Sequence, residues 1–181
     1  MKKINEIFYS LQGEGYNTGT PAVFIRFSGC NLHCGFCDTR HEQGTMMTDN
    51  EIISEVSKYP ARMVVLTGGE PSLWIDGALI GRLHKLHKYV TVETNGTHIL
   101  PLGIDWITCS PKIGGEVIIE HIDELKVVYE GQDLNQYSRY ITPHRFLQPC
   151  SNKNIGETIE CIKKNPEWRL SLQTHVILNI R

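Results

Sequence analysis

The sequence lacks the features of a membrane protein or a nucleic-acid-binding protein. No stretch approaches the roughly 20 consecutive apolar residues that a membrane-spanning helix needs, so no membrane association is expected. Basic and acidic side chains nearly balance, with 18 Lys and Arg against 20 Asp and Glu. Without a basic stripe, nucleic acid is not a favoured partner, and small-molecule chemistry is the better expectation.

The chain also has little that suggests secretion. Residues 1–16 show no long apolar run followed by a small-residue cleavage site, so no signal peptide is expected. Three of the six cysteines are too tightly bunched to pair as disulfides, and the others are scattered. This cysteine usage is typical of the reducing cytoplasm, where we expect the protein to work.

Linkers, repeats and low-complexity segments are missing as well, so a single domain is expected over residues 1–181. Strand-like and helix-like stretches alternate, which favours a parallel sheet. A closed eight-unit barrel needs about 250 residues, so the predicted fold is α/β, an open or partial βα barrel of about six βα units. Strands are predicted at 22–27, 63–66, 89–93, 105–108, 125–129 and 145–147, and helices after the capping residues Thr48, Asp76 and Asn154.

Among the residues that are present, three cysteines carry the most information. Cys30, Cys34 and Cys37 follow the first predicted strand with the spacing C-x3-C-x2-C. An iron–sulfur cube needs four ligands, so three thiolates leave one iron open to a small molecule. Structural zinc or a ferredoxin-like carrier needs a fourth ligand, and zinc sites usually show two ligand pairs, which this chain lacks. The open-iron cluster is favoured, with a non-catalytic zinc or electron-carrier module as the alternative and Cys150 as a possible surplus ligand.

Unusual residues gather where the predicted strands end. In barrels and open α/β sheets, ligands bind at the carboxyl ends of the strands. Five strand ends with such residues therefore predict one binding mouth. Paired glycines let a ligand approach the main chain closely, although a plain strand-to-helix turn would also use them. The strand-end residues are Arg26, Thr67-Gly68-Gly69-Glu70-Pro71, Glu93-Thr94-Asn95-Gly96, Ser110-Pro111-Lys112 and Gln148-Pro149.

Two of these motifs resemble a known superfamily. The cysteine spacing resembles the signature of the radical S-adenosylmethionine superfamily, and Gly68-Gly69-Glu70-Pro71 is similar to its Gly-Gly-Glu-Pro motif. A narrower resemblance, to the 7-carboxy-7-deazaguanine synthases, spans most of the chain. It is carried by Tyr9-Ser10-Leu11-Gln12-Gly13-Glu14-Gly15, Phe24-Ile25-Arg26-Phe27-Ser28-Gly29-Cys30-Asn31-Leu32, Cys37-Asp38-Thr39, Glu93-Thr94-Asn95-Gly96-Thr97, Ser110-Pro111-Lys112 and Leu170-Ser171-Leu172-Gln173-Thr174-His175.

This resemblance implies a carbon–nitrogen lyase. Members of that family convert 6-carboxy-5,6,7,8-tetrahydropterin to 7-carboxy-7-deazaguanine and release ammonia, on the way to queuosine and related 7-deazapurines. The implied cofactors are a [4Fe-4S] cluster, S-adenosylmethionine and Mg²⁺. The implied partners are an electron donor such as flavodoxin or ferredoxin and a second copy of the chain. A glycyl-radical-enzyme activase, which shares the cysteine spacing, is the alternative enzyme.

The resemblance also implies roles for individual residues. Cys30, Cys34 and Cys37 would hold the cluster, and Thr39 would bind the magnesium ion. Arg26 lies in an apolar strand, where its charge needs a partner, either a salt bridge or the carboxylate of the substrate. The substrate-binding residues would be Leu11, Gln12, Gly13, Glu14, Arg26 and Thr67. The S-adenosylmethionine-binding residues would be Phe36, Cys37, Asp38, Gly69, Glu93, Ser110, Pro111, Lys112 and Gln148.

Ordinary structural roles stay open for several of these residues. Thr39 could cap the cysteine loop, Thr67 could be structural, and Lys112 could be a solvated surface lysine. The chain is short for the family, so some helices of the usual core are expected to be trimmed. The C-terminus, ending at Arg181, is expected to fold over the active site, as in the family that the sequence resembles.

Overall fold

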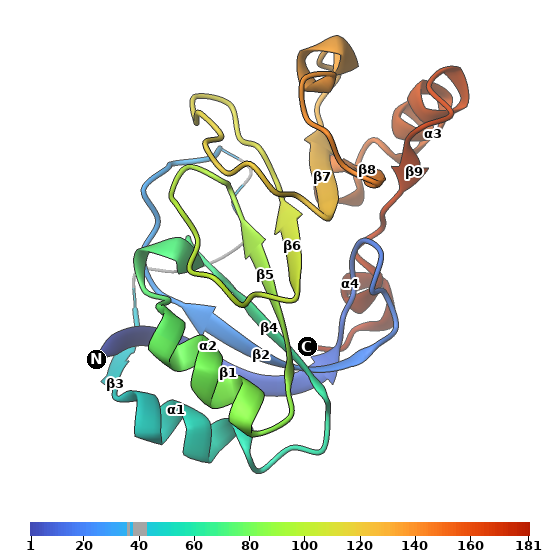
Figure 1. Ribbon diagram of the computed structural model, residues 1–181. Helices are drawn as coiled ribbons and strands as arrows, with labels where there is room; N and C mark the ends of the chain where they lie inside the picture. Colours follow the sequence, from blue (N-terminus) through green and yellow to red (C-terminus); the bar gives the residue numbers. More distant parts are fainter. Residues whose placement is uncertain (36, 38–42) are drawn as a thin grey trace.

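One curved sheet forms the frame of the protein. The computed structural model describes residues 1–35, 37 and 43–181. Its nine strands follow the order β3-β1-β2-β4-β5-β6-β7-β8-β9, and the two edge strands do not pair with each other. The sheet is curved, and because its edges do not meet it forms an open half-barrel (Figure 1). Among the described residues, no helix is long and apolar enough to cross a membrane.

Most neighbouring strands are parallel, and only β1 runs against its two neighbours. The strands are β1 (Lys2–Leu11), β2 (Pro21–Phe27), β3 (Thr45–Met47), β4 (Met63–Gly68), β5 (Tyr89–Thr94), β6 (Trp106–Cys109), β7 (Glu124–Tyr129), β8 (His144–Pro149) and β9 (Arg169–Leu170). The helices are α1 (Asp49–Val56), α2 (Gly77–Lys85), α3 (Ile155–Lys164) and α4 (Thr174–Leu178), with 3-10 turns at Pro71–Leu73, Leu134–Tyr137 and Cys150–Asn152.

The prediction of an open α/β half-barrel is confirmed, and the expectation of trimmed helices holds. All six predicted strands are present, as β2 and β4 to β8. The predicted βα units are incomplete, however. Within the described residues, no helix lies between β5 and β6 or between β6 and β7, and only a 3-10 turn joins β7 to β8. The half-barrel is therefore covered by helices mainly at its two ends, α1 and α2 at one and α3 at the other (Figure 1).

The sequence predicts no strand before residue 22, whereas β1 is the longest strand of the sheet, with ten residues. It pairs with β2 so that Phe8 lies opposite Phe24, and these rings stack with centroids 4.9 Å apart. The sequence pattern does not reveal β1, because the strand begins with polar residues. Lys2 is nevertheless buried, and its ammonium contacts Asp49 at 2.7 Å and Asp76 at 2.9 Å. These partners lie at the starts of α1 and α2.

Two of the three predicted helix caps are present. The Thr48 hydroxyl accepts from the Glu51 amide at 3.3 Å and the Glu51 carboxylate accepts from the Thr48 amide at 2.7 Å, which is the predicted capping box. The Asp76 carboxylate accepts from the Leu79 amide at 2.9 Å. Asn154 lies at the predicted N-cap position of α3, but its side chain makes no cap bond and instead accepts from the Cys150 amide at 2.8 Å.

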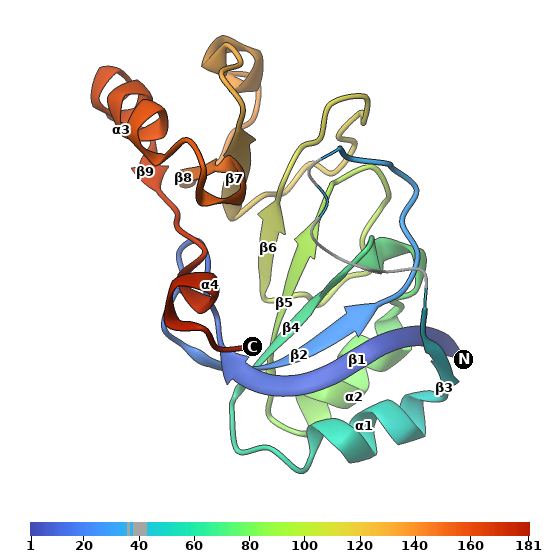
Figure 2. The ribbon, with the colours of Figure 1, turned by 180° about the vertical axis from the view of Figure 1, so that it is seen from behind.

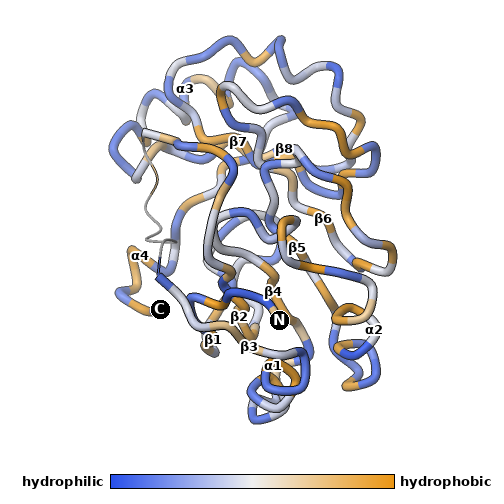
Figure 3. Tube along the Cα trace, turned by 90° about the vertical axis from the view of Figure 1, so that its left-hand side faces the viewer, coloured by the Kyte–Doolittle hydropathy of each residue, from blue (hydrophilic) through white to orange (hydrophobic). Residues whose placement is uncertain are grey.

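The core lies between the sheet and its helices, and strand alternation decides which side chains face it. Val64 and Leu66 of β4 are fully buried against the side chains of α1 and α2. Both helices contain hydrophobic as well as hydrophilic residues, as an amphipathic helix requires (Figure 3). Thr67, on the opposite face of β4, lines the inside of the half-barrel. The inner face carries polar side chains such as Thr67 beside an apolar cluster that includes Phe8 and Phe24, which also line the cavity.

Candidate functional site

A cavity of about 610 Å³ lies at the inner face of the half-barrel. The residues that line it come from the predicted strand ends, from β1 and from the C-terminal segment. Predicted site residues on this wall are Cys30, Cys34, Cys37, Leu11, Gln12, Gly13, Glu14, Arg26, Thr67, Gly69, Glu93, Ser110, Lys112 and Gln148. Pro111 is not among them, and Phe36, Asp38 and Thr39 lie outside the described residues. The structure brings the strand ends together, as the sequence predicts, and the ligand roles stay predictions.

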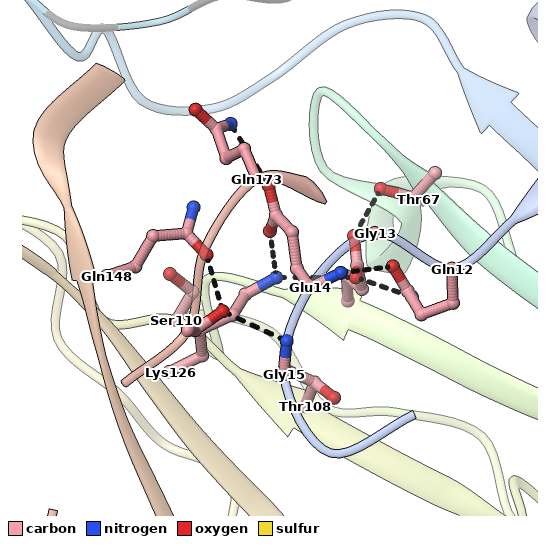
Figure 4. Close-up of polar contacts among 12 residues, drawn as sticks. Gln12, Gly13, Glu14, Gly15, Thr67, Thr108, Ser110, Lys126, Gln148 and Gln173 are labelled. Atoms are coloured by element: carbon pink, nitrogen blue, oxygen red, sulfur yellow. Dashed lines mark hydrogen bonds and ion pairs between the residues drawn. The ribbon is translucent and has the colours of Figure 1, made fainter. Parts of the chain in front are cut away.

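The floor of this cavity is formed by a buried lysine, Lys126, and two carboxylates that pair with it, Glu14 and Glu93. The Lys126 ammonium, on β7, contacts one oxygen of Glu14 in an ion pair (Figure 4). It also lies 3.4 Å from Oε1 of Glu93. Burial alone would raise the pKa of Glu14, but the charge of Lys126 and the hydrogen bonds from Lys126 and Gln173 together outweigh it and hold that pKa below its usual value of 4.5. The sequence does not predict Lys126, although a lysine in the apolar stretch of β7 is the same kind of signal as Arg26 in β2.

Glu93 and Gln12 connect the floor to two further elements. The Glu93 carboxylate accepts from the Thr67 hydroxyl at 3.0 Å and from the Gln12 amide nitrogen at 3.1 Å. The Gln12 side-chain oxygen accepts from the Glu14 backbone N–H at 3.1 Å. Gln12, Glu93 and Thr67 therefore form a chain of contacts between the β1–β2 loop, β5 and β4. This arrangement places predicted pterin-binding and cofactor-binding residues in direct contact.

The β1–β2 loop, residues 12–20, closes the space between the first and last strands. The Gly15 amide donates to the Ser171 hydroxyl at 2.9 Å, and this hydroxyl donates to the Gln148 side-chain oxygen at 2.9 Å. Gly15 has a positive φ of 67°, and a Cβ there would lie 1.9 Å from an oxygen of Glu124. A glycine is required because the loop has to pass this closely over β7.

The loop that carries the cysteines is fastened to the end of β5. The Asn31 side-chain nitrogen donates to the Thr97 hydroxyl at 2.8 Å, and the Asn31 side-chain oxygen accepts from the side-chain nitrogen of Asn95 at 3.0 Å. The Leu32 amide lies 3.4 Å from the Cys30 sulfur, in the position of a donor to a thiolate. Asn95 and Thr97 belong to the Glu93 to Thr97 motif, so part of that motif has a structural reason.

The three predicted cluster ligands lie on one cavity wall. Burial raises the pKa of the Cys30 and Cys34 thiols, and the neighbouring cysteines raise both further. In the described part of the chain, no three His, Cys, Asp or Glu side chains form a group that could hold a metal ion. The donor types nonetheless suit a three-thiolate cluster, because all three cysteines line the same cavity. Cys150, the possible surplus ligand, is not among the lining residues.

The Gly-Gly-Glu-Pro segment joins β4 to its neighbours. A Cβ on Gly69 would lie 2.1 Å from the carbonyl oxygen of Gly29, directly before the cysteines. The fully buried Glu70 accepts from the Thr94 hydroxyl and the Asn95 amide, each at 2.7 Å, and from the Ser72 amide at 3.0 Å. The glycines therefore permit close packing on the cysteine loop, and the glutamate fastens β4 to β5.

Arg26 has the salt bridge that was one of its two predicted partners, and it also borders the cavity. Its Nε lies 3.0 Å from Oε1 of Glu6, and the side chain is 25 % exposed. The other Glu6 oxygen lies 2.5 Å from the guanidinium of Arg181. The sequence does not predict Glu6 as a site residue, because it predicts no strand at β1.

The C-terminal segment also reaches the cavity. The Thr174 amide and hydroxyl both donate to the Gly13 carbonyl oxygen, at 3.0 and 2.9 Å. In Figures 1 and 2, α4 lies beside the end of β1. His175 and Arg181 line the cavity, so the C-terminal segment borders the site, and closure over a bound substrate stays a prediction. Gln173, which donates to Glu14 at 3.0 Å, is a further residue that the sequence does not predict for the site.

The fold and the site together indicate the class of protein, since an open α/β half-barrel has a cavity that is lined by three cysteines. The family description "Radical SAM superfamily" matches residues 24–167. The crystal structure of QueE from Escherichia coli has a TM-score of 0.78 and 30 % sequence identity, covering 94 % of this chain and 93 % of that one.

Sequence comparison narrows the class further. A 7-carboxy-7-deazaguanine synthase from Bacteroides thetaiotaomicron is 67 % identical over 181 residues, covering 100 % of both chains. A 7-carboxy-7-deazaguanine synthase from Burkholderia multivorans is 38 % identical over 205 aligned positions, covering 98 % of both chains. The chain belongs to the 7-carboxy-7-deazaguanine synthase family. The predicted family and enzyme class are therefore confirmed. The alternatives, a glycyl-radical-enzyme activase and a zinc or electron-carrier module, are not supported.

Proposed function

We propose that this protein converts 6-carboxy-5,6,7,8-tetrahydropterin to 7-carboxy-7-deazaguanine and releases ammonia, in the synthesis of queuosine and related 7-deazapurines. One observation carries the proposal. The cysteines and the predicted pterin-binding residues Gln12, Glu14 and Arg26 line the same cavity of about 610 Å³. Family membership supports the same conclusion.

The cofactors are proposed from the chemistry of the cavity wall and from the superfamily. Cys30, Cys34 and Cys37 would hold a [4Fe-4S] cluster with one iron open to S-adenosylmethionine. When bound, this pair supplies a 5′-deoxyadenosyl radical. Gly69, having no side chain, lets an amino group approach the main chain. The remaining proposed S-adenosylmethionine contacts are Phe36, Cys37, Asp38, Glu93, Ser110, Pro111, Lys112 and Gln148.

The substrate would bind between the β1–β2 loop and Arg26. The Arg26 guanidinium suits a carboxylate, since its planar fork matches two oxygens. Polar groups of Gln12 and Glu14 and the main chain at Leu11 and Gly13 would contact the ring, with Thr67 nearby. Magnesium prefers oxygen ligands and keeps several waters, so the Thr39 hydroxyl together with substrate oxygens is the proposed site.

The family resemblance supports three further parts of the proposal. The protein would work in the cytoplasm, would form a homodimer and would receive electrons from a carrier such as flavodoxin or ferredoxin. Sedimentation velocity of the anaerobic protein tests the dimer. Replacing dithionite with purified flavodoxin or ferredoxin in the turnover assay tests the electron donor. A monomer at micromolar concentration, or no turnover with either carrier, would contradict these parts of the proposal.

The reaction is tested with anaerobically reconstituted protein, the carboxypterin, S-adenosylmethionine, Mg²⁺ and a reductant. We expect 7-carboxy-7-deazaguanine by mass spectrometry and one ammonia for each product. Fully loaded enzyme that gives no deazaguanine would refute the proposal. Cys34→Ser should lose iron and product, whereas the matched variant Cys150→Ser should keep both, because Cys150 is not among the cavity-lining residues.

A further inference from the structure

Lys126 stands out because no motif predicts it and because its ionic partners are carboxylates, with the half-buried Lys112 as a further charged neighbour. Its side chain is only 7 % exposed and lines the cavity. The ammonium forms an ion pair with Glu14 and lies 3.4 Å from Glu93. A third carboxylate, Glu124, is buried near it and accepts from the Tyr16 amide at 3.1 Å. A buried lysine is costly unless it is paired, so this cluster needs a reason.

The charges of this cluster decide what Lys126 can do. Burial alone would lower the pKa of Lys126, but Glu14, Glu93 and Glu124 outweigh it and raise that pKa above its usual value of 10.5. A group that keeps its proton so firmly is a poor acid for a departing amine. Lys126 is therefore a fixed positive charge rather than a proton donor.

The fixed positive charge of Lys126 also favours the ionised form of Glu14, because it lowers the pKa of that carboxyl. Ionised carboxylates only accept hydrogen bonds, whereas protonated ones also donate. The pterin ring of the proposed substrate presents an amino group beside a ring N–H, an edge made only of donors. Glu14 and Glu93 both line the cavity and would face such an edge with acceptors.

We propose that Lys126 is a positioning residue for the pterin, which holds the Glu14 and Glu93 carboxylates in place as hydrogen-bond acceptors for the donor edge of the ring. This inference rests on the proposed function and adds a residue through which the substrate class is recognised. A purely structural role is the competing explanation, because the Lys126–Glu14 pair also ties the β1–β2 loop to β7. The two explanations predict different results in binding experiments.

The first experiment compares Lys126→Met, Lys126→Arg and the control Lys2→Met. Lys2 is equally buried and pairs with Asp49 and Asp76, outside the cavity. Anaerobic titration gives the Kd of the carboxypterin for each loaded enzyme. We expect Lys126→Met to raise Kd by ~10- to 100-fold, as losing one hydrogen bond to a charged group does, with kcat at saturation within about threefold. Lys126→Arg should recover most of the affinity, and Lys2→Met should lose stability only.

A double variant separates positioning from structural support. Replacing both members of a buried pair is close to neutral for stability, so Glu14→Gln with Lys126→Met should regain the melting temperature that Lys126→Met loses. The positioning role predicts that its Kd stays high, because no carboxylate remains at residue 14. A return of both stability and affinity would overturn the inference, and so would a wild-type Kd in Lys126→Met. Because Kd is measured without turnover, a wild type that binds the pterin but forms no deazaguanine contradicts only the proposed reaction.

Discussion

Replacing Glu70 by glutamine tests how the Gly-Gly-Glu-Pro segment holds neighbouring strand ends together. The substitution keeps the shape of the side chain but leaves one acceptor oxygen instead of two. Oε1 of Glu70 accepts from the Thr94 hydroxyl and the Ser72 amide, and Oε2 accepts from the Asn95 amide. Whichever way the new amide is turned, its NH₂ group faces a buried donor.

The expected cost follows from these contacts. The better orientation keeps the glutamine oxygen toward Thr94 and Ser72 and turns the NH₂ toward the Asn95 N–H. One hydrogen bond to a charged group is then lost, worth about 1.5–3 kcal/mol, and a buried N–H is left unpaired at about 1–3 kcal/mol. Removing a buried charge offsets part of this loss. We expect Glu70→Gln to lower the free energy of unfolding by about 3 kcal/mol, or the melting temperature by roughly 6–12 °C.

Urea unfolding of the apo-protein measures this change. Glu51→Gln is the matched control, because the amide and the hydroxyl of Thr48 both donate to the same exposed oxygen of Glu51, which the glutamine retains. That variant should stay within about 0.5 kcal/mol of the wild type. Since Asn95 also holds Asn31, reconstituted Glu70→Gln should retain less iron. A loss of stability below about 1 kcal/mol in Glu70→Gln would refute the reasoning.

Three further outcomes are expected. Gly69→Ala should lower the free energy of unfolding by about 3 kcal/mol or more, since its Cβ would lie 2.1 Å from the Gly29 oxygen; near-wild-type urea unfolding would contradict this. Gly81→Ala, in α2 with open space around it, should raise stability by about 0.5–1 kcal/mol in the same assay. Because the pKa of Glu14 is lowered in the fold, its stabilising contribution is present above pH 4.5 and lost as the pH falls through the lowered pKa; Glu14→Gln should flatten that part of the stability profile.

The cavity wall could be predicted where local sequence patterns fix it. Cys30, Cys34 and Cys37 are close in sequence, and Thr67 and Glu93 follow recognisable apolar strands. Because parallel strands place their carboxyl ends on one edge, these residues had to meet. No such local rule applies to β1, whose buried Lys2 breaks the apolar alternation and is neutralised by residues from two helices. Glu6 was missed with that strand.

The remaining part of the site depends on long-range contacts. Glu14 and Lys126 are 112 residues apart in the chain, and Glu14 and Gln173 are 159 apart. Their pairing depends on the curvature of the sheet, which brings β7 and the C-terminal segment to the β1–β2 loop. Asn154 shows the same limit on a smaller scale, since its side chain contacts the Cys150 amide instead of capping its helix.

The sequence by itself determined the family and the parallel strands, and it predicts the cysteine ligand set, because each depends on spacing or on periodicity along the chain. Only the tertiary structure decided that a buried lysine joins two carboxylates at the cavity floor, that Arg26 pairs with Glu6, and that Cys150 is not part of the cavity wall. A charge can be buried only where its partners are, and the curved sheet, not the order of residues, brings those partners together.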